Sequence, residues 1–177
     1  MEYCLKYPTY NVGLTHIWRA DLRLNKLIKL ILWIVFFESI GFLLGLLTQA
    51  NINPWYANLN KSSLTPPGFI FSIVWTLLYA LLAVIAWILS NHNQAYSKKI
   101  KVLFTLQMLM NWAWTPLFFA LHWLISSALW LVGLTFLNLL LIMEAKKMHK
   151  IIACLLSPYL LWLVYALYLN VVIALTN

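Results

Sequence analysis

The sequence predicts an all-α membrane protein in which five transmembrane helices form one bundle, with the N-terminus cytoplasmic and the C-terminus on the opposite side. Three observations predict this fold class. Of the 177 residues, 64% are hydrophobic and only 9% are charged, which is too little charge to cover a water-soluble domain. The apolar residues gather in five long runs. The basic residues gather between alternate runs, as the topology of membrane proteins requires.

Each apolar run has close to the ~20 residues that a helix needs to cross the hydrocarbon core of a bilayer. The runs are continuous instead of alternating, which argues against a β-barrel and leaves a helical bundle as the spanning structure. A short turn at His122 separates the third run from the fourth, so we expect a tight antiparallel pair there. The predicted spans are Leu30–Thr48, Phe69–Ser90, Val102–Leu121, Trp123–Met143 and Ile151–Leu175.

The basic residues orient the bundle. Eleven of the 12 Lys and Arg residues fall on one side of a five-span arrangement, and Lys61 falls on the other. The side that holds the eleven basic residues is therefore cytoplasmic. The same asymmetry explains the net charge of +8, so we expect a lipid bilayer with anionic headgroups as a partner and no nucleic acid. Residues 1–28 form a basic cytoplasmic extension with a helix lying on the membrane surface, and residues 29–177 form the five-helix membrane domain.

Three of the spans carry aromatic and amide side chains at helical spacing. Amides inside a membrane are costly unless they face the bundle interior, so Gln107, Asn111 and Asn170 orient their helices inward. Their alternative role is to link helices by hydrogen bonds. The predicted inward faces hold Phe71, Trp75, Tyr79 and Leu82 on the second span, Gln107, Asn111, Trp114 and Phe118 on the third, and Tyr159, Trp162, Ala166, Leu169 and Asn170 on the fifth.

Three motif blocks occur in order along these spans. They are WYANLNKSSLTPPGFIFSIVWTLLY (55–79), NWAWTPLFF (111–119) and LLSPYLLWLVYALYLN (155–170). This pattern resembles the TspO/MBR family, which comprises the tryptophan-rich sensory proteins of bacteria and the translocator proteins, or peripheral benzodiazepine receptors, of animals. The resemblance extends from about residue 53 to residue 170. One block could arise by chance in an apolar protein, whereas three in the same order are specific.

The resemblance implies a ligand-binding protein. Family members bind tetrapyrroles of the protoporphyrin IX and haem type, and animal members bind cholesterol and synthetic ligands. It places Trp75 and Trp162 against a planar ring and keeps Ala166 small so that the ligand fits. Porphyrin would be a ligand; no obligatory cofactor and no metal site are expected. The candidate ligand-binding residues are Trp55, Lys61, Phe71, Trp75, Tyr79, Gln107, Asn111, Trp114, Phe118, Tyr159, Trp162, Ala166 and Asn170.

The loop between the first two spans, Trp55–Pro67, would be a lid over this pocket. Its two prolines fix the entry to the second span. Lys61 could pair with an anionic propionate, or it could be an interfacial residue that extends toward the headgroups. The family usually has proline where this chain has Ser62, so we expect a less rigid lid.

The predicted function is that of a membrane receptor, sensor or carrier for a tetrapyrrole or a similar hydrophobic molecule. One alternative is light-dependent porphyrin degradation, with Trp75 and Trp162 as redox participants. Another is a scaffold that binds no ligand. The sequence shows no nucleophile–base pair, so conventional enzyme chemistry has no starting point. We expect a multi-pass protein of a bacterial cell membrane, or of the mitochondrial outer membrane in a eukaryote.

Two further departures from the family pattern limit the partners. Residues 171–177 contain no Lys or Arg, so the cholesterol-recognition pattern of animal members is missing. Val102 and Leu106 replace the small residues through which some members pair, which disfavours a homodimer through this helix.

Two features of the first span stand outside this pattern. Glu38 is either a proton or ion site or a structural residue that is protonated or extends toward the interface. Gly41 and Gly45 have the spacing for close helix packing, which we expect within the chain instead of between copies.

Overall fold

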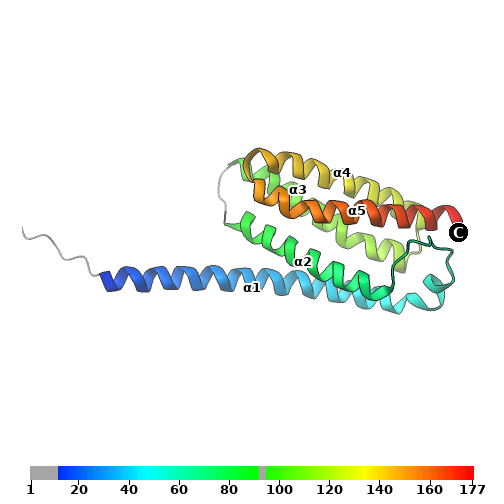
Figure 1. The fold of residues 1–177 in the computed structure, drawn as a ribbon, viewed down its shortest axis with the longest axis horizontal. Helices are drawn as coiled ribbons and strands as arrows, with labels where there is room; N and C mark the ends of the chain where they lie inside the picture. Colours follow the sequence, from blue (N-terminus) through cyan, green and yellow to red (C-terminus); the bar gives the residue numbers. More distant parts are fainter. Residues whose placement is uncertain (1–11, 92–94) are drawn as a thin grey trace, which may run out of the picture.

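The computed structural model describes residues 12–91 and 95–177. Five long helices cross the molecule: α1 (Val12–Ala50), α2 (Gly68–Ser90), α3 (Ala95–Thr115), α4 (Leu124–Met148) and α5 (Lys150–Thr176) (Figure 1). Two short segments of wider π-type turns, η1 (Ile52–Tyr56) and η2 (Pro116–Ala120), follow α1 and α3. Within the described residues, five helices are long and apolar enough to cross a membrane, which confirms the predicted spans.

Helix α1 begins well before the predicted first span. It runs without a break from Val12 to Ala50, so the described part of the N-terminal extension continues the axis of the span (Figure 1). This differs from the surface helix that we predicted. The reason is local: residues 14–40 contain no glycine or proline that would interrupt a helix. Residues 1–11 of the extension lie outside the described residues.

Pro116 determines where α3 ends. Proline has no N–H to donate, and its ring crowds the carbonyl one turn earlier, so the helix loosens into the wider turns of η2. The chain then reverses at His122, whose φ of 57° lies in the left-handed region. The Trp123 amide donates to the Leu117 carbonyl at 3.1 Å across this reversal. The tight turn predicted at His122 is confirmed.

The helices form a closed ring in the order α1, α2, α5, α4, α3, because each contacts the next and α3 contacts α1. Packing is most extensive between α4 and α5 and between α1 and α2, and it is much sparser between α2 and α5. Gly41 permits the approach of α1 to α2, since a Cβ at this position would lie 2.6 Å from the Tyr79 ring. Gly45 has nothing within 4 Å, so the close packing involves Gly41 and lies within the chain.

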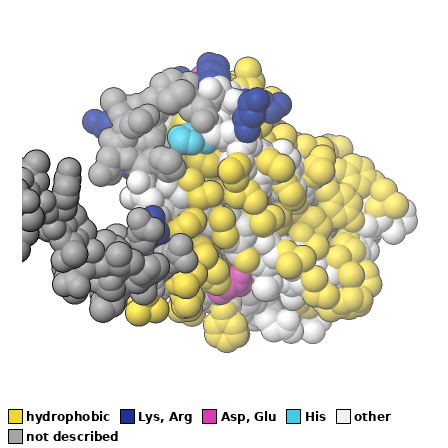
Figure 2. All heavy atoms as spheres, turned by 60° about the vertical axis from the view of Figure 1, so that its left-hand side comes forward, with side chains coloured by type: hydrophobic (Ala, Val, Ile, Leu, Met, Phe, Trp, Pro, Cys, Tyr) yellow, Lys and Arg dark blue, Asp and Glu magenta, His cyan; other side chains and the backbone are white. Residues whose placement is uncertain are grey.

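The two ends of the bundle differ. One end holds the α2–α3 and α4–α5 connections and carries Lys98, Lys99, Lys146 and Lys147; we call it the basic end. The other end holds loop 1–2 (residues 51–67) and the C-terminus; we call it the cap end (Figure 1). Glu144 joins α4 to α3 at the basic end through a 3.1 Å ion pair with Lys99. Figure 2 shows a face covered mostly by apolar side chains, with Lys and Arg gathered near the basic end. This surface suits a bilayer.

Candidate ligand-binding site

Hydrogen bonds join three helices in the middle of the bundle. The Tyr79 hydroxyl on α2 donates to Asn111 Oδ1 on α3 at 3.1 Å, and Asn111 Nδ2 donates to the Tyr159 hydroxyl on α5 at 2.8 Å. All three side chains are buried, and Gln107, one turn from Asn111, is fully buried. We call Tyr79, Gln107, Asn111 and Tyr159 the interior polar cluster. The prediction that the amides of α3 face inward is confirmed.

Aromatic rings line the seam between α2 and α5. Trp75 and Trp162 meet edge to face with their ring centroids 6.4 Å apart. Phe71 packs edge to face on Trp162 at 5.6 Å, and Tyr79 lies 5.4 Å from Trp75. We call Phe71, Trp75, Tyr79 and Trp162 the aromatic ladder. Trp162 is partly buried, yet its indole N–H has no hydrogen-bond partner. Ala166 packs against the same core.

The other predicted aromatic residues form a separate group at the cap end. Trp114 stacks on Phe118 at 5.3 Å, and Trp55 packs on Phe118 at 5.5 Å. Trp55 also stacks on His122, with centroids 3.9 Å apart and planes inclined by 15°. The predicted site is therefore spread over two clusters: Trp55 and Phe118 belong to the one at the cap end, whereas Trp114 packs against both. The cap cluster consists of Trp55, Tyr56, Trp114, Phe118, Phe119 and His122.

Asn170 serves this cap cluster as a link between helices. In the amide orientation that satisfies its neighbours, it accepts from the Trp114 indole N–H at 3.1 Å and from the Ser127 hydroxyl at 3.2 Å. Its amide nitrogen donates to the Leu124 carbonyl at 3.1 Å. Both amide atoms of this buried side chain are thus used to connect α3, α4 and α5. Of the two roles predicted for Asn170, the geometry favours the structural one.

Lys61 is committed to the loop that carries it. Its ammonium donates to the carbonyls of Tyr56, Ala57 and Leu59 at 2.8, 3.0 and 2.9 Å. It also lies 4.9 Å from the centre of the Tyr56 ring. All three protons of the ammonium are used in this way, so an anionic ligand would have to displace a carbonyl to pair with Lys61.

Loop 1–2 is tied to α5. The Tyr165 hydroxyl donates to the Leu64 carbonyl at 2.7 Å, and the hydroxyls of Ser62 and Tyr168 lie 2.9 Å apart. Ser62, which stands in place of the family proline, thus holds the loop through a hydrogen bond. At the chain end, the backbone N–H of Asn60 donates to Asn177 Oδ1 at 2.8 Å, and Asn177 Nδ2 donates to the Asn60 carbonyl at 3.0 Å. These anchors were not predicted, because they depend on the path of the loop and not on residue spacing.

The predicted pocket between α2, α3 and α5 is closed in this structure. Tyr159 is fully buried and Tyr79 is 5% exposed, so the side chains of the site fill the space themselves. Apolar interiors pack densely when nothing else occupies them. A planar guest would therefore have to separate the rings of the aromatic ladder.

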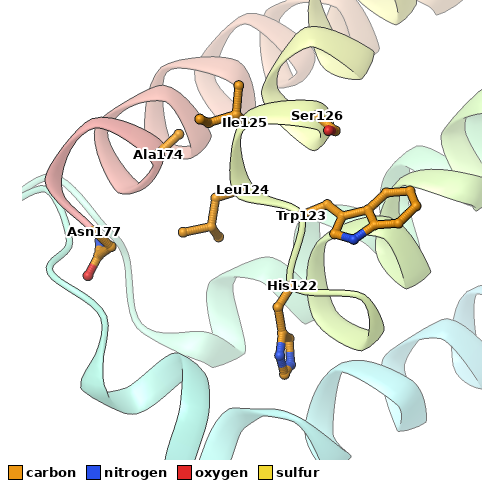
Figure 3. A pocket seen from close by; sticks show the side chains of 7 residues that line it. All are labelled: His122, Trp123, Leu124, Ile125, Ser126, Ala174 and Asn177. Atoms are coloured by element: carbon orange, nitrogen blue, oxygen red, sulfur yellow. The ribbon is translucent and has the colours of Figure 1, made fainter.

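Two surface hollows in the described part of the chain lie away from the predicted pocket between α2, α3 and α5. One, at the cap end, has a volume of about 470 Å³, and Trp123 points away from its other labelled lining residues (Figure 3). Its lining residues are His122, Trp123, Leu124, Ile125, Ser126, Ala174 and Asn177. The other, of about 450 Å³, lies along α1 and is lined by Val35, Glu38, Ser39, Phe42 and Leu43. Glu38 thus faces this hollow, and one of its carboxyl oxygens has no hydrogen-bond partner.

Two residues of interest were not predicted. Asn138 on α4 is fully buried, and neither atom of its amide has a partner. The rule that identifies Gln107, that an amide inside a span faces the bundle, identifies Asn138 as well. His122 was predicted only as the position of a turn. Its stacking on Trp55 depends on the left-handed turn, which residue spacing does not reveal.

Comparison with known proteins agrees with this architecture. The model of the TspO/MBR family matches residues 30–175. The tryptophan-rich protein TspO of Archaeoglobus fulgidus is 31% identical over 152 residues, which cover 86% of this chain and 99% of that protein. The tryptophan-rich protein TspO of Bacillus cereus is 33% identical over 138 residues, which cover 77% of this chain and 90% of that protein. The translocator protein of Ovis aries is 33% identical over 127 residues, which cover 66% of this chain and 70% of that protein. This multi-pass membrane protein therefore belongs to the TspO/MBR family.

Proposed function

We propose that this protein is a membrane receptor or carrier that binds a tetrapyrrole, or a similar flat hydrophobic molecule, between α2, α3 and α5 beneath loop 1–2. The observation that carries the proposal is the contact of Trp75 with Trp162, two indoles from different helices at 6.4 Å. Indole faces offer a large stacking area, and the unpaired N–H of Trp162 is a donor for a polar group of the guest.

The packing of the helices supports entry at this seam. Helix α5 packs extensively on α4 but only sparsely on α2, and the ladder lies along the sparse contact. An edge-to-face aromatic pair contributes about 0.5–1.5 kcal/mol beyond its burial. A guest that stacks on both indoles regains that contribution and buries more apolar area than it displaces. Sparse packing on α2 and the ring contacts along it therefore favour the seam between α2 and α5 as the place where a guest enters.

Titration with protoporphyrin IX tests the proposal. We expect purified protein in detergent micelles to show saturable quenching of tryptophan fluorescence. Trp75→Phe and Trp162→Phe should each weaken binding by about tenfold, because each loses part of a stacking surface. Trp123→Phe is the matched control, since Trp123 is 53% exposed and should leave the affinity unchanged. Absence of saturable binding, or equal affinity in all four proteins, would overturn the proposal.

Light-dependent porphyrin degradation is a second candidate, because the same contact would hold two oxidisable indoles against an excited ring. Illumination of the complex separates the two functions. A new product absorbance that disappears in the two phenylalanine variants supports degradation, whereas one that persists is ordinary photobleaching. A ligand-free scaffold instead predicts no binding and tolerance of leucine at both indole positions.

A further inference from the structure

Two buried amides in the described part of the chain keep atoms that have no hydrogen-bond partner. Asn138 on α4 is fully buried, and neither Oδ1 nor Nδ2 has a hydrogen-bond partner. Gln107 on α3 is also fully buried. Its amide interacts with the Tyr159 hydroxyl and its Nε2 lies 3.6 Å from the weakly accepting sulfur of Met108, but its Oε1 has no partner. Asn111 and Asn170, by contrast, are paired at both amide atoms. The whole amide of Asn138 and the Oε1 of Gln107 therefore retain hydrogen-bonding capacity inside the bundle.

The helix register brings Asn138 to the interior polar cluster. Ser127 on α4 hydrogen-bonds Asn170 on α5, and the two helices are antiparallel. Three turns of a helix take ~11 residues and return to the same face. Asn138 lies three turns from Ser127, and Tyr159 lies three turns from Asn170 in the opposite direction along the chain. Asn138 and Tyr159 therefore lie at one level, on the faces of α4 and α5 that carry Ser127 and Asn170.

Gln107 reaches the same level from α3. It lies one turn from Asn111 on the same helix face, and Asn111 donates to the Tyr159 hydroxyl at 2.8 Å. Gln107, a member of the cluster, and Asn138 thus lie at one level on adjacent helices, since α3 packs on α4. In the absence of a guest they lower the stability of the protein, because an unpaired buried amide has lost its water without gaining a partner.

The charges around this level select the kind of group that fits. The Lys residues of the described part of the chain lie in loop 1–2 or toward the basic end, including Lys26 and Lys29 of α1, so no described Lys stands at this depth to balance a buried anion. An amide instead offers one donor and one acceptor side by side. Its complement is another neutral group with a donor next to an acceptor, which is a lactam or a carboxamide.

We propose that Gln107 and Asn138 form a polar subsite that hydrogen-bonds a neutral lactam or carboxamide of the bound molecule. This inference rests on the proposed function and describes the deep end of the same site. It favours a linear tetrapyrrole with lactam ends, or another flat amide, over a ring that lacks such a group. Carboxylates of the guest remain toward the cap end, where loop 1–2 carries the positive charge of Lys61.

Two probes with the same propionates test the subsite: biliverdin IX, which ends in lactams, and protoporphyrin IX, which has none. We expect the wild-type protein to bind biliverdin about tenfold more tightly, and Asn138→Leu to lose that preference. The same substitution should raise the melting temperature of the ligand-free protein by about 2–4 °C, because it removes an unpaired buried amide and keeps the branching and the number of side-chain heavy atoms. A purely structural asparagine would lower that temperature instead.

Two further variants keep the test decisive. Thr135→Val is the control on α4, since the Thr135 hydroxyl already donates to the Leu131 carbonyl at 2.7 Å, and it should leave the preference unchanged. Gln107→Met should lose part of the preference even if Asn138→Leu does not fold. If the wild type binds neither probe, the proposed function fails. If it binds protoporphyrin IX but shows no preference for biliverdin, or if both variants keep the preference, the subsite is overturned while the proposed function stands.

Discussion

The cap cluster and the interior of the bundle are both rich in aromatic residues, but they differ in how their polar atoms are paired. At the cap end, the amide of Asn170 and the ammonium of Lys61 have all their partners, although the hydroxyl of Thr65 does not. In the interior, Gln107 and Asn138 have unpaired amide atoms. Hydrogen-bond pairing, and not aromatic content, therefore distinguishes the cap cluster from the interior.

The packing of the two regions follows the same division. The cap end is held by hydrogen bonds from loop 1–2 to Tyr165, Tyr168 and the chain end. The aromatic ladder is held by ring contacts along the sparsely packed seam between α2 and α5. We therefore expect changes in the interior to alter stability and ligand binding together, and changes at the cap end to alter the mobility of the loop.

The largest effect is expected where α1 meets the interior. Gly41→Ala places a methyl group 2.6 Å from the Tyr79 ring, so Tyr79 or α1 must move. Such overpacking costs about 1–3 kcal/mol of unfolding free energy, and it should also weaken protoporphyrin binding. Gly45→Ala is the control, because nothing lies within 4 Å of its Cβ, and it should be neutral or slightly stabilising. Equal unfolding free energies for the two variants in micelles would contradict the close contact.

A pair of tyrosine variants compares the two regions directly. Tyr159→Phe leaves Asn111 Nδ2 without its partner in the interior, which should lower the unfolding free energy by about 0.6–2 kcal/mol. Tyr165→Phe breaks the bond to the Leu64 carbonyl at the exposed cap end, where water can replace the hydroxyl. Hydrogen exchange should then accelerate in loop 1–2 for Tyr165→Phe and not for Tyr159→Phe. The opposite pattern would reverse the comparison.

Lys61→Met should loosen the loop without unfolding the bundle. The substitution keeps most of the apolar length but removes three hydrogen bonds to loop carbonyls. We expect about tenfold faster amide exchange in residues 56–61, which corresponds to about 1.4 kcal/mol of local opening free energy. Unchanged exchange would mean that the loop is held by α5 alone.

The smallest effect is expected at the chain end. Removal of Thr176 and Asn177 deletes their hydrogen bonds to Asn60, all of which are exposed. Exposed bonds contribute little because water substitutes for them, so the unfolding free energy should change by about 0.5 kcal/mol or less. Exchange at the Asn60 amide should still rise. A large loss of global stability would show that the cap end carries the fold, contrary to this account.

The parts of the structure that were predictable depend on composition and local periodicity. The five spans and the inward amides of Gln107 and Asn111 follow from apolar length and from the cost of polar groups in lipid. The division of the aromatic residues did not follow, because Pro116 widens the turns after α3 and the loop brings Trp55 onto Phe118. The closure of the pocket also could not be predicted, since it depends on how rings from α2 and α5 pack together.

The proposed function requires that the aromatic ladder opens to admit a flat guest. An experimental structure of the complex with protoporphyrin IX tests this most directly. We expect the ring of the guest to lie against Trp75 and Trp162, with the centroids of the two indoles farther apart than the 6.4 Å seen here. A guest in the hollow beside His122 or along α1, with the contact between the two indoles intact, would contradict it.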